Sequence, residues 1–151
     1  MITKLGVAGV FVTDYDEAKE FFIDKLGFEL RHDLTMENGY RWLTVGPPAS
    51  PGFQLAISVP GPPTHDEETA AMLSALLAKG ALSAGAWHTD DCRKTFAEYS
   101  ARGVEFLQEP VDRPYGVEAV FRDPFGNWYS LNEPNEATFD TGAMKAAYPE
   151  G

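Results

Sequence analysis

Hydrophobic and polar positions follow two different periods along the first half of the chain. An apolar stretch over residues 5–12 predicts a strand that stops at Thr13-Asp14. Asp14 or Asp16 can cap the helix that follows, and Gly27 can end it. The apolar residues of this helix recur at i, i+3, i+4 and i+8, which places them on one face: Ala18, Phe21, Phe22 and Leu26. Further extended segments are expected at residues 28–30, 40–45 and 53–59.

The second half of the chain repeats this order. Residues 84–89 have the pattern of a strand, Asp90-Asp91 can cap the next helix, and Gly103 can end it. Asp91 follows Asp14 by 77 residues (91 − 14), and Gly103 matches Gly27 after a slip of one residue. Three more strands are expected at residues 104–106, 117–122 and 128–132. The sequence therefore predicts an internal duplication.

A proline-rich linker and a helix separate the two halves. The linker begins at Pro60, and the helix runs from Thr64, which has capping-box spacing to Glu67, to about Lys79. The acidic residues of its first turn, with His65, could be imagined as metal ligands, but the helix dipole favours acids there in any case. We expect one domain with two repeats, about 2–59 and 82–133, a linker and helix over 60–80, and a C-terminal tail over 134–151.

Composition and charge narrow the classes of partner. The chain has 151 residues, of which 44% are hydrophobic and 13% aromatic, enough for one buried core. Its 12 Lys and Arg against 23 Asp and Glu give a net charge of −11, which repels nucleic acid and anionic membranes. No apolar run approaches the roughly 20 residues of a membrane-spanning helix. With no signal-peptide pattern and a single cysteine, Cys92, we expect a cytoplasmic protein.

Several motifs resemble those of one known superfamily. They are Val12-Thr13-Asp14, Leu26-Gly27-Phe28, residues 102–106 and, above all, Arg122-Asp123-Pro124-Phe125-Gly126-Asn127-Trp128. Together they resemble the vicinal oxygen chelate superfamily, which includes glyoxalase I, extradiol dioxygenases, fosfomycin resistance enzymes and bleomycin-binding proteins. The resemblance covers about residues 2–133. It implies an α+β fold of two βαβββ modules with curled mixed sheets that form a cleft, usually in a homodimer.

The metal-ligand positions of that family are not filled by the usual residues. Enzymes of the family carry His or Glu on the first and last strands of each module. The corresponding positions here are Val7, Gln54, Ala84 and Ser130. A two-residue slip keeps the same strand face but offers only Gly9, Ala56, Ser58, Ala86, Trp128 or Asn132. Because a divalent cation prefers imidazole or carboxylate ligands, we expect no metal and no other cofactor.

The cleft that the resemblance implies is suited to a flat organic ligand. Small residues on the first strand of each half leave volume, and aromatic side chains can form its walls. His88 points toward the cleft and could bind a ligand or act as a general base, whereas His32 and His65 receive no role. Trp87 faces the helix side by the same alternation. The expected cleft residues are Phe11, Trp42, Gln54, Ala84, His88, Tyr115, Trp128 and Ser130.

Two functions remain in competition. The first is a metal-free protein that binds a small, aromatic molecule, for sequestration or antibiotic resistance. The second is an enzyme of the lyase, isomerase or dioxygenase type that uses an atypical metal site or His88 as acid or base. The missing His and Glu ligands favour the first.

Overall fold

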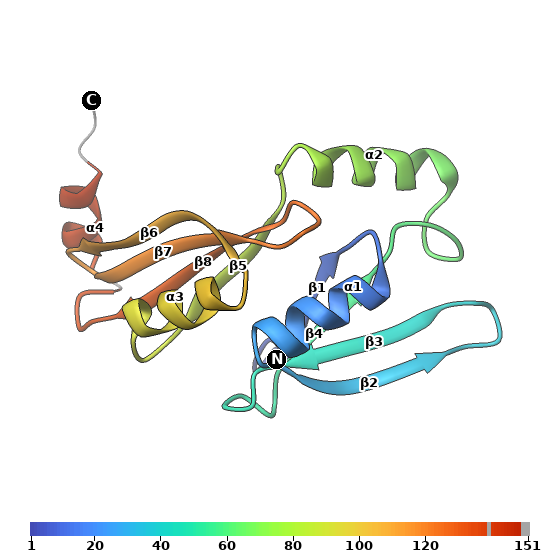
Figure 1. The fold of residues 1–151 in the computed structure, drawn as a ribbon, viewed down its shortest axis with the longest axis horizontal. Helices are drawn as coiled ribbons and strands as arrows, with labels where there is room; N and C mark the ends of the chain where they lie inside the picture. The colour runs from blue at the N-terminus through green and yellow to red at the C-terminus, as the bar shows by residue number, and fades with distance from the viewer. Residues whose placement is uncertain (139, 149–151) are drawn as a thin grey trace. The chain divides into compact units, whose positions relative to one another are not determined.

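Two four-stranded sheets, each with a helix packed on one face, carry the fold (Figure 1). The computed structural model describes residues 1–138 and 140–148. The strand orders are β1-β4-β3-β2 and β5-β8-β7-β6, so the two halves share one topology. The elements are β1 (Val7–Phe11), α1 (Tyr15–Lys19), the π-helical η1 (Glu20–Lys25), β2 (Glu29–Thr35), β3 (Arg41–Gly46), β4 (Gln54–Ser58), α2 (Glu67–Ala78), β5 (Ser83–His88), α3 (Cys92–Ala101), β6 (Glu105–Arg113), β7 (Gly116–Arg122), β8 (Trp128–Pro134) and α4 (Thr141–Ala147). The predicted α+β class with two βαβββ modules is confirmed.

The chain folds as two units whose boundary does not follow the sequence exactly. The first contains residues 1–82 and the turn 124–127, and the second contains residues 83–123 and the chain from 128 onward. Gly126 in this turn has φ +113°, and a Cβ there would lie 2.0 Å from the backbone oxygen of Leu77 in α2. Only glycine fits so close an approach. The turn between β7 and β8 is therefore part of the first unit.

The core of the first unit lies between its helix and one face of its sheet. The four apolar helix residues that the sequence places on one face, at positions 18, 21, 22 and 26, are all buried. They meet the buried side chains that alternate along the strands, such as Leu43, Val45, Leu55 and Ile57. Asp14 is the N-cap, and its carboxylate accepts a hydrogen bond of 2.8 Å from the backbone N–H of Glu17. The period-3.6 and period-2 patterns thus predicted this core correctly.

An ionic cluster ties the same helix to the edge of the sheet. Asp33 on β2 accepts hydrogen bonds of 2.8 and 2.9 Å from Arg41 on β3 and also pairs with Lys19. The Arg41 guanidinium lies 4.6 Å from the centre of the Tyr15 ring. The hydrogen bonds from Arg41, and then from Lys19, hold the pKa of the Asp33 carboxyl well below its usual range. Asp33 therefore remains ionised under ordinary conditions.

The second unit has an aromatic core. Phe121 on β7 and Tyr129 on β8 stack with ring centres 4.8 Å apart, and the Tyr129 hydroxyl donates to Asp123 at 2.8 Å. The cap of α3 is Asp91, which accepts from the backbone N–H of Lys94. The next residue, Cys92, is fully buried, and burial, with the charge of Glu133, raises the pKa of its thiol to about 11. Burial therefore disfavours the thiolate form of Cys92.

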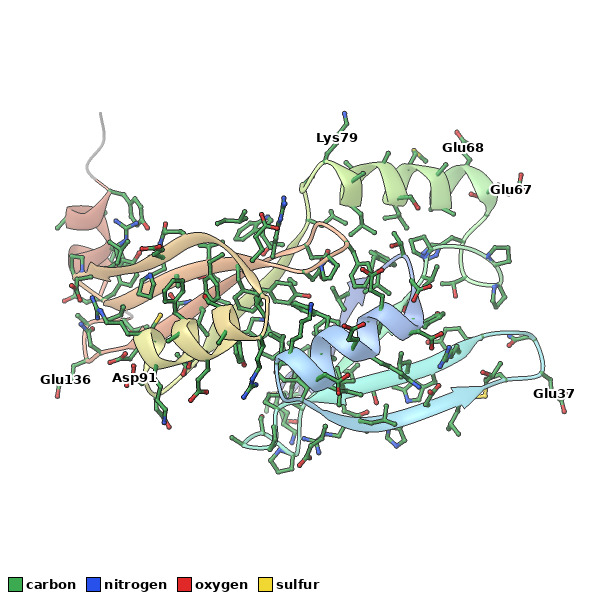
Figure 2. The ribbon with its side chains drawn as sticks, viewed as in Figure 1. Glu37, Glu67, Glu68, Lys79, Asp91 and Glu136 are labelled. Carbon is green, nitrogen blue, oxygen red and sulfur yellow. The ribbon has the colours of Figure 1, made fainter. Side chains whose placement is uncertain are left out.

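Helix α2 begins two residues later than the sequence suggests. Its N-cap is Asp66, whose carboxylate accepts from the backbone N–H of Thr69 at 2.7 Å, so the expected cap at Thr64 was wrong. Figure 2 shows Glu67 and Glu68 extending outward at the start of α2 and Lys79 at its other end, an arrangement that suits the helix dipole. Within the described residues, no helix is long and apolar enough to cross a membrane.

Candidate functional site

The face of the first sheet that α1 does not cover carries a row of small side chains. In register across neighbouring strands lie Gly9 on β1, Ala56 on β4, Thr44 on β3 and His32 on β2. A Cβ added at Gly9 would meet no atom within 4 Å. The row therefore forms a floor that is open above Gly9, whereas its Thr44 side chain is fully buried beside His32. We call this surface the open face of the first sheet.

Larger side chains border this floor. On one side, Phe11 at the end of β1 lies across from Ser58, and Trp42 on β3 lies across from Leu34. The Phe11 ring also meets the ring of His65 edge-on, with centres 5.6 Å apart. The predicted site residues Phe11 and Trp42 thus share the open face of the first sheet, where they supply an aromatic border.

The other border contains the positions at which the family resemblance expects metal ligands. Val7 and Gln54 lie directly opposite each other on the parallel strands β1 and β4. The two positions that the resemblance assigns to metal ligands in the first half are thus neighbours, although neither side chain is an imidazole or a carboxylate. A valine methyl and a neutral amide do not fit a divalent transition metal.

A polar cluster of Gln54, Thr44 and His32 lies on the same face, and of these three residues the sequence analysis identified only Gln54. The Gln54 side-chain oxygen Oε1 accepts from the Thr44 hydroxyl at 2.8 Å and lies 3.0 Å from Nδ1 of His32. The same Nδ1 is 3.2 Å from the Thr44 oxygen. Thr44 is fully buried, whereas His32 is exposed. The three side chains hold one another in place.

The second sheet has a corresponding open face with a different register at one end. Ser83 lies across from Trp128, Ala86 across from Ser130, and His88 across from Asn132. A bulge separates the first two of these pairs. Ala84 lies in this bulge, beside Gly85 at φ +91°, and its backbone oxygen accepts from the Trp87 ring at 2.9 Å. Trp87 itself lies across from the buried Leu131, on the side that the alternation predicted.

His88 has an exposed side chain, and none of the residues that the structure describes orients it. Its strand neighbour Asn132 donates instead to the Ser130 hydroxyl oxygen at 2.9 Å. Within the described part of the chain, the His88 ring makes no hydrogen bond and no ion pair. A general base needs such an orienting partner to hold its tautomer and direction.

The two predicted aromatic residues of the second unit lie at opposite ends of its sheet. Trp128 is across from Arg122, the last residue of β7, whereas Tyr115 precedes Gly116, the first. Six residues of strand, about 20 Å, separate these ends. The Tyr115 hydroxyl donates to Glu118 at 2.9 Å and lies 2.8 Å from the hydroxyl of Tyr148. Burial, and then these hydrogen bonds, raise the pKa of Tyr115.

Equivalent hydrogen bonds in the two halves give the register of the duplication. The backbone N–H of Val12 donates to Ser58, and that of Thr89 donates to Asn132, each at 2.9 Å. Counting back along the last strands matches Ala56 with Ser130 and Gln54 with Trp128. Neither this register nor the one inferred from the motifs places a His or Glu at the paired positions. Among the described residues, no three His, Cys, Asp or Glu side chains lie close enough to hold a metal ion.

These features, two sheets of one βαβββ topology and the Asp-Pro-Phe-Gly-Asn turn between β7 and β8, agree with the comparison to known families. The sequence model of the Glyoxalase/Bleomycin resistance protein/Dioxygenase superfamily matches residues 4–131. The chain belongs to this superfamily. The family is also called vicinal oxygen chelate, so the resemblance drawn from the motifs is confirmed.

Similar proteins of this superfamily have been solved or sequenced. The crystal structure of UcmS2 superposes with a TM-score of 0.84 at 47% identity, covering 88% of this chain and 99% of that one. TnmS3, described as an antibiotic binding protein from Streptomyces sp. CB03234, superposes with a TM-score of 0.70 at 30% identity, covering 89% and 98%. An uncharacterized protein of Shewanella frigidimarina is 32% identical over 130 residues, which is 83% of this chain and 89% of the relative.

Proposed function

We propose that this protein binds a small, planar aromatic molecule and sequesters it, without the metal centre of the superfamily's enzymes. The observation that carries the proposal is the open space at Gly9, on the same sheet face as Val7 and Gln54, the positions at which the resemblance expects metal ligands. The description of TnmS3 as an antibiotic binding protein supports this choice, because the two chains are 30% identical over most of their length.

The aromatic border gives this site its affinity in the proposal. Phe11 and Trp42 would pack on the faces or edges of the ligand's rings, where stacking adds about 0.5–1.5 kcal/mol beyond the burial of area. The net charge of −11 favours a neutral or cationic ligand over an anionic one. For the second sheet, taken by itself, we propose Trp128, Ser130 and His88 on its open face as ligand-binding residues, together with Ala84 in the bulge of β5 and Tyr115 before β7.

Assembly and location belong to the same proposal. A homodimer would complete the binding surface of each βαβββ module, as isologous pairing does in many small proteins. Light scattering should then give a mass near twice the 16.6 kDa of the chain, and a stable monomer at micromolar concentration would contradict it. The single, buried Cys92 is consistent with a reducing, cytoplasmic environment.

The competing hypothesis of an enzyme receives less support from these contacts. His88 would have to act as acid or base without the orienting carboxylate or hydroxyl that such a group needs. An atypical metal site would need a set of ligands that the described residues do not bring together.

A fluorescence titration tests the proposal directly. The purified protein is titrated with a panel of polycyclic aromatic compounds while its tryptophan emission is recorded. Saturable quenching with no turnover of the bound compound is the expected result. Absence of binding across the panel, or conversion of a compound to product, would contradict the proposal.

A further inference from the structure

We propose that His32, held by Gln54, accepts a hydrogen bond from an N–H or O–H group at the edge of the aromatic ligand. The inference rests on the proposed function and deepens it by naming the chemistry that the site selects. It concerns the open face of the first sheet alone. There, His32 ends the row of side chains that begins at Gly9.

The position of the imidazole proton follows from the hydrogen bonds around Gln54. Its oxygen Oε1 can only accept, so the 3.0 Å contact with Nδ1 of His32 places a proton on Nδ1. The Thr44 hydroxyl directs its own proton to the same Oε1 at 2.8 Å. A neutral imidazole that carries its proton on Nδ1 has its lone pair on Nε2. The cluster therefore presents Nε2 as an acceptor.

This acceptor is available to a ligand. The His32 side chain is exposed, and no hydrogen bond of its Nε2 occurs within the described residues. Thr44, the buried residue across from it, is inaccessible from solvent. A hydrogen-bond donor that approaches the cluster from outside therefore meets His32 first.

The distances on the sheet suit a ligand of about three fused rings. Neighbouring strands lie about 4.8 Å apart, so the three steps from β1 to β2 span about 14 Å. A ring placed on Gly9 and Ala56 would extend across the strands toward His32, whose imidazole lies between the buried Thr44 and the solvent. A donor at the ligand's edge would then lie next to Nε2.

The charges around His32 point to a neutral donor rather than to an ion. On the open face its two partners, Thr44 and Gln54, are uncharged. The neighbouring Asp33 pairs with Lys19 and Arg41 on the helix-covered face. Arg31 is paired with Glu29. No unpaired charge beside His32 in its own strand would attract an ionic ligand.

Three probes of nearly the same shape test this selection. Carbazole carries an N–H donor, N-methylcarbazole has it blocked, and fluorene lacks it. Wild-type protein should bind carbazole about 2- to 10-fold more tightly than the other two, the range of one net hydrogen bond. His32→Phe should remove that preference and retain fluorene binding. His65→Phe, which keeps an aromatic ring against Phe11, is the matched control and should retain the preference.

The results separate this inference from the function on which it rests. If all three probes bind wild type equally, or if His32→Phe keeps the preference for carbazole, the role of His32 is overturned while ligand binding stands. If no probe and no compound of the aromatic panel binds, both proposals fail together.

A second measurement tests Gln54 as a positioning residue. Nitrogen NMR of the His32 ring should show the proton on Nδ1 in wild type and a larger share on Nε2 in Gln54→Leu. That variant should also lose most of the carbazole preference while its fluorene affinity changes less. A proton on Nε2 of the wild-type ring would overturn the proposal, because Nε2 would then be a donor.

Discussion

The side-chain amide of Asn127 donates a hydrogen bond of 2.7 Å to the backbone oxygen of Phe11, 116 residues earlier in the chain. Asn127 is only 2% exposed, and Phe11 ends the strand β1 that begins the aromatic border. The bond holds the turn 124–127 within the first unit. A residue of the sequence's most diagnostic motif thus supports the open face of the first sheet from its edge.

Replacing Asn127 should therefore destabilise the protein. Asn127→Ala leaves the Phe11 oxygen without its buried donor, which costs about 1–3 kcal/mol. Urea unfolding followed by circular dichroism measures the difference. Asn38→Ala, in an exposed turn where the side-chain oxygen accepts from the backbone N–H of Tyr40, is the control and should cost less. Equal stability of the Asn127 variant and wild type would contradict the account.

The Asp33 cluster predicts a loss of stability in acid. Because Arg41 and Lys19 lower the pKa of Asp33 in the folded state, its contribution is present above the unfolded pKa of about 4. It is lost as the pH falls from there toward the lower folded pKa. Asp33→Asn should lower stability at neutral pH by about 1–2 kcal/mol and flatten this dependence. Denaturant unfolding at several pH values measures both effects. If the free energy of unfolding of Asp33→Asn falls in acid as steeply as that of wild type, the contribution assigned to Asp33 is wrong.

The two tryptophans on the open faces, Trp42 and Trp128, should each contribute measurably to the affinity for an aromatic ligand. Trp42→Ala or Trp128→Ala removes stacking and apolar contact area, at roughly 25 cal/mol per Å², so affinity should fall at least several-fold. Trp87→Phe, on the helix-covered side of the second sheet, is the matched control and should keep wild-type affinity. Titration of the ligand's own fluorescence avoids the loss of a tryptophan signal. If both alanine variants bind the ligand with wild-type affinity, stacking on Trp42 and Trp128 does not contribute to binding.

The residues at the expected ligand positions predict the metal content of the purified protein. Elemental analysis should find well under one Zn, Ni, Fe or Mn per chain, because Val7 and Gln54 offer no imidazole or carboxylate. A chelator should leave ligand binding unchanged. One tightly held metal per chain, with loss of function on its removal, would reverse the ranking of the two functions.

Much of the fold was accessible from the sequence because its signals are local. The helix period around Phe21 and Phe22, the caps at Asp14 and Asp91, and the alternation along β4 each predicted an element or a buried face that the structure confirms. The short extended segments at residues 28–30 and 104–106 proved to be parts of the longer strands β2 and β6. Their full lengths depend on pairing with neighbouring strands.

The open faces were harder to predict because their registers contain bulges. His32 reaches the row of Thr44 after a register shift between Leu30 and His32, which no local pattern announces. Ala84 lies in a second bulge, between Ser83 and Ala86, which the local sequence pattern does not indicate either. The position of the turn 124–127 in the first unit is a contact between distant parts of the chain. Alternation alone therefore found the correct strand faces but missed the polar cluster.

The division of the first sheet into a helix-covered face and an open face affects how this protein can evolve. The ionic cluster and the apolar core lie on one face, so they secure folding independently of the residues at positions 9, 32, 42 and 56. Mutations at those four positions should therefore cost little stability. Under the proposed function, a lineage carrying this scaffold can change the ligand that it binds through few substitutions, each of which leaves the protein folded.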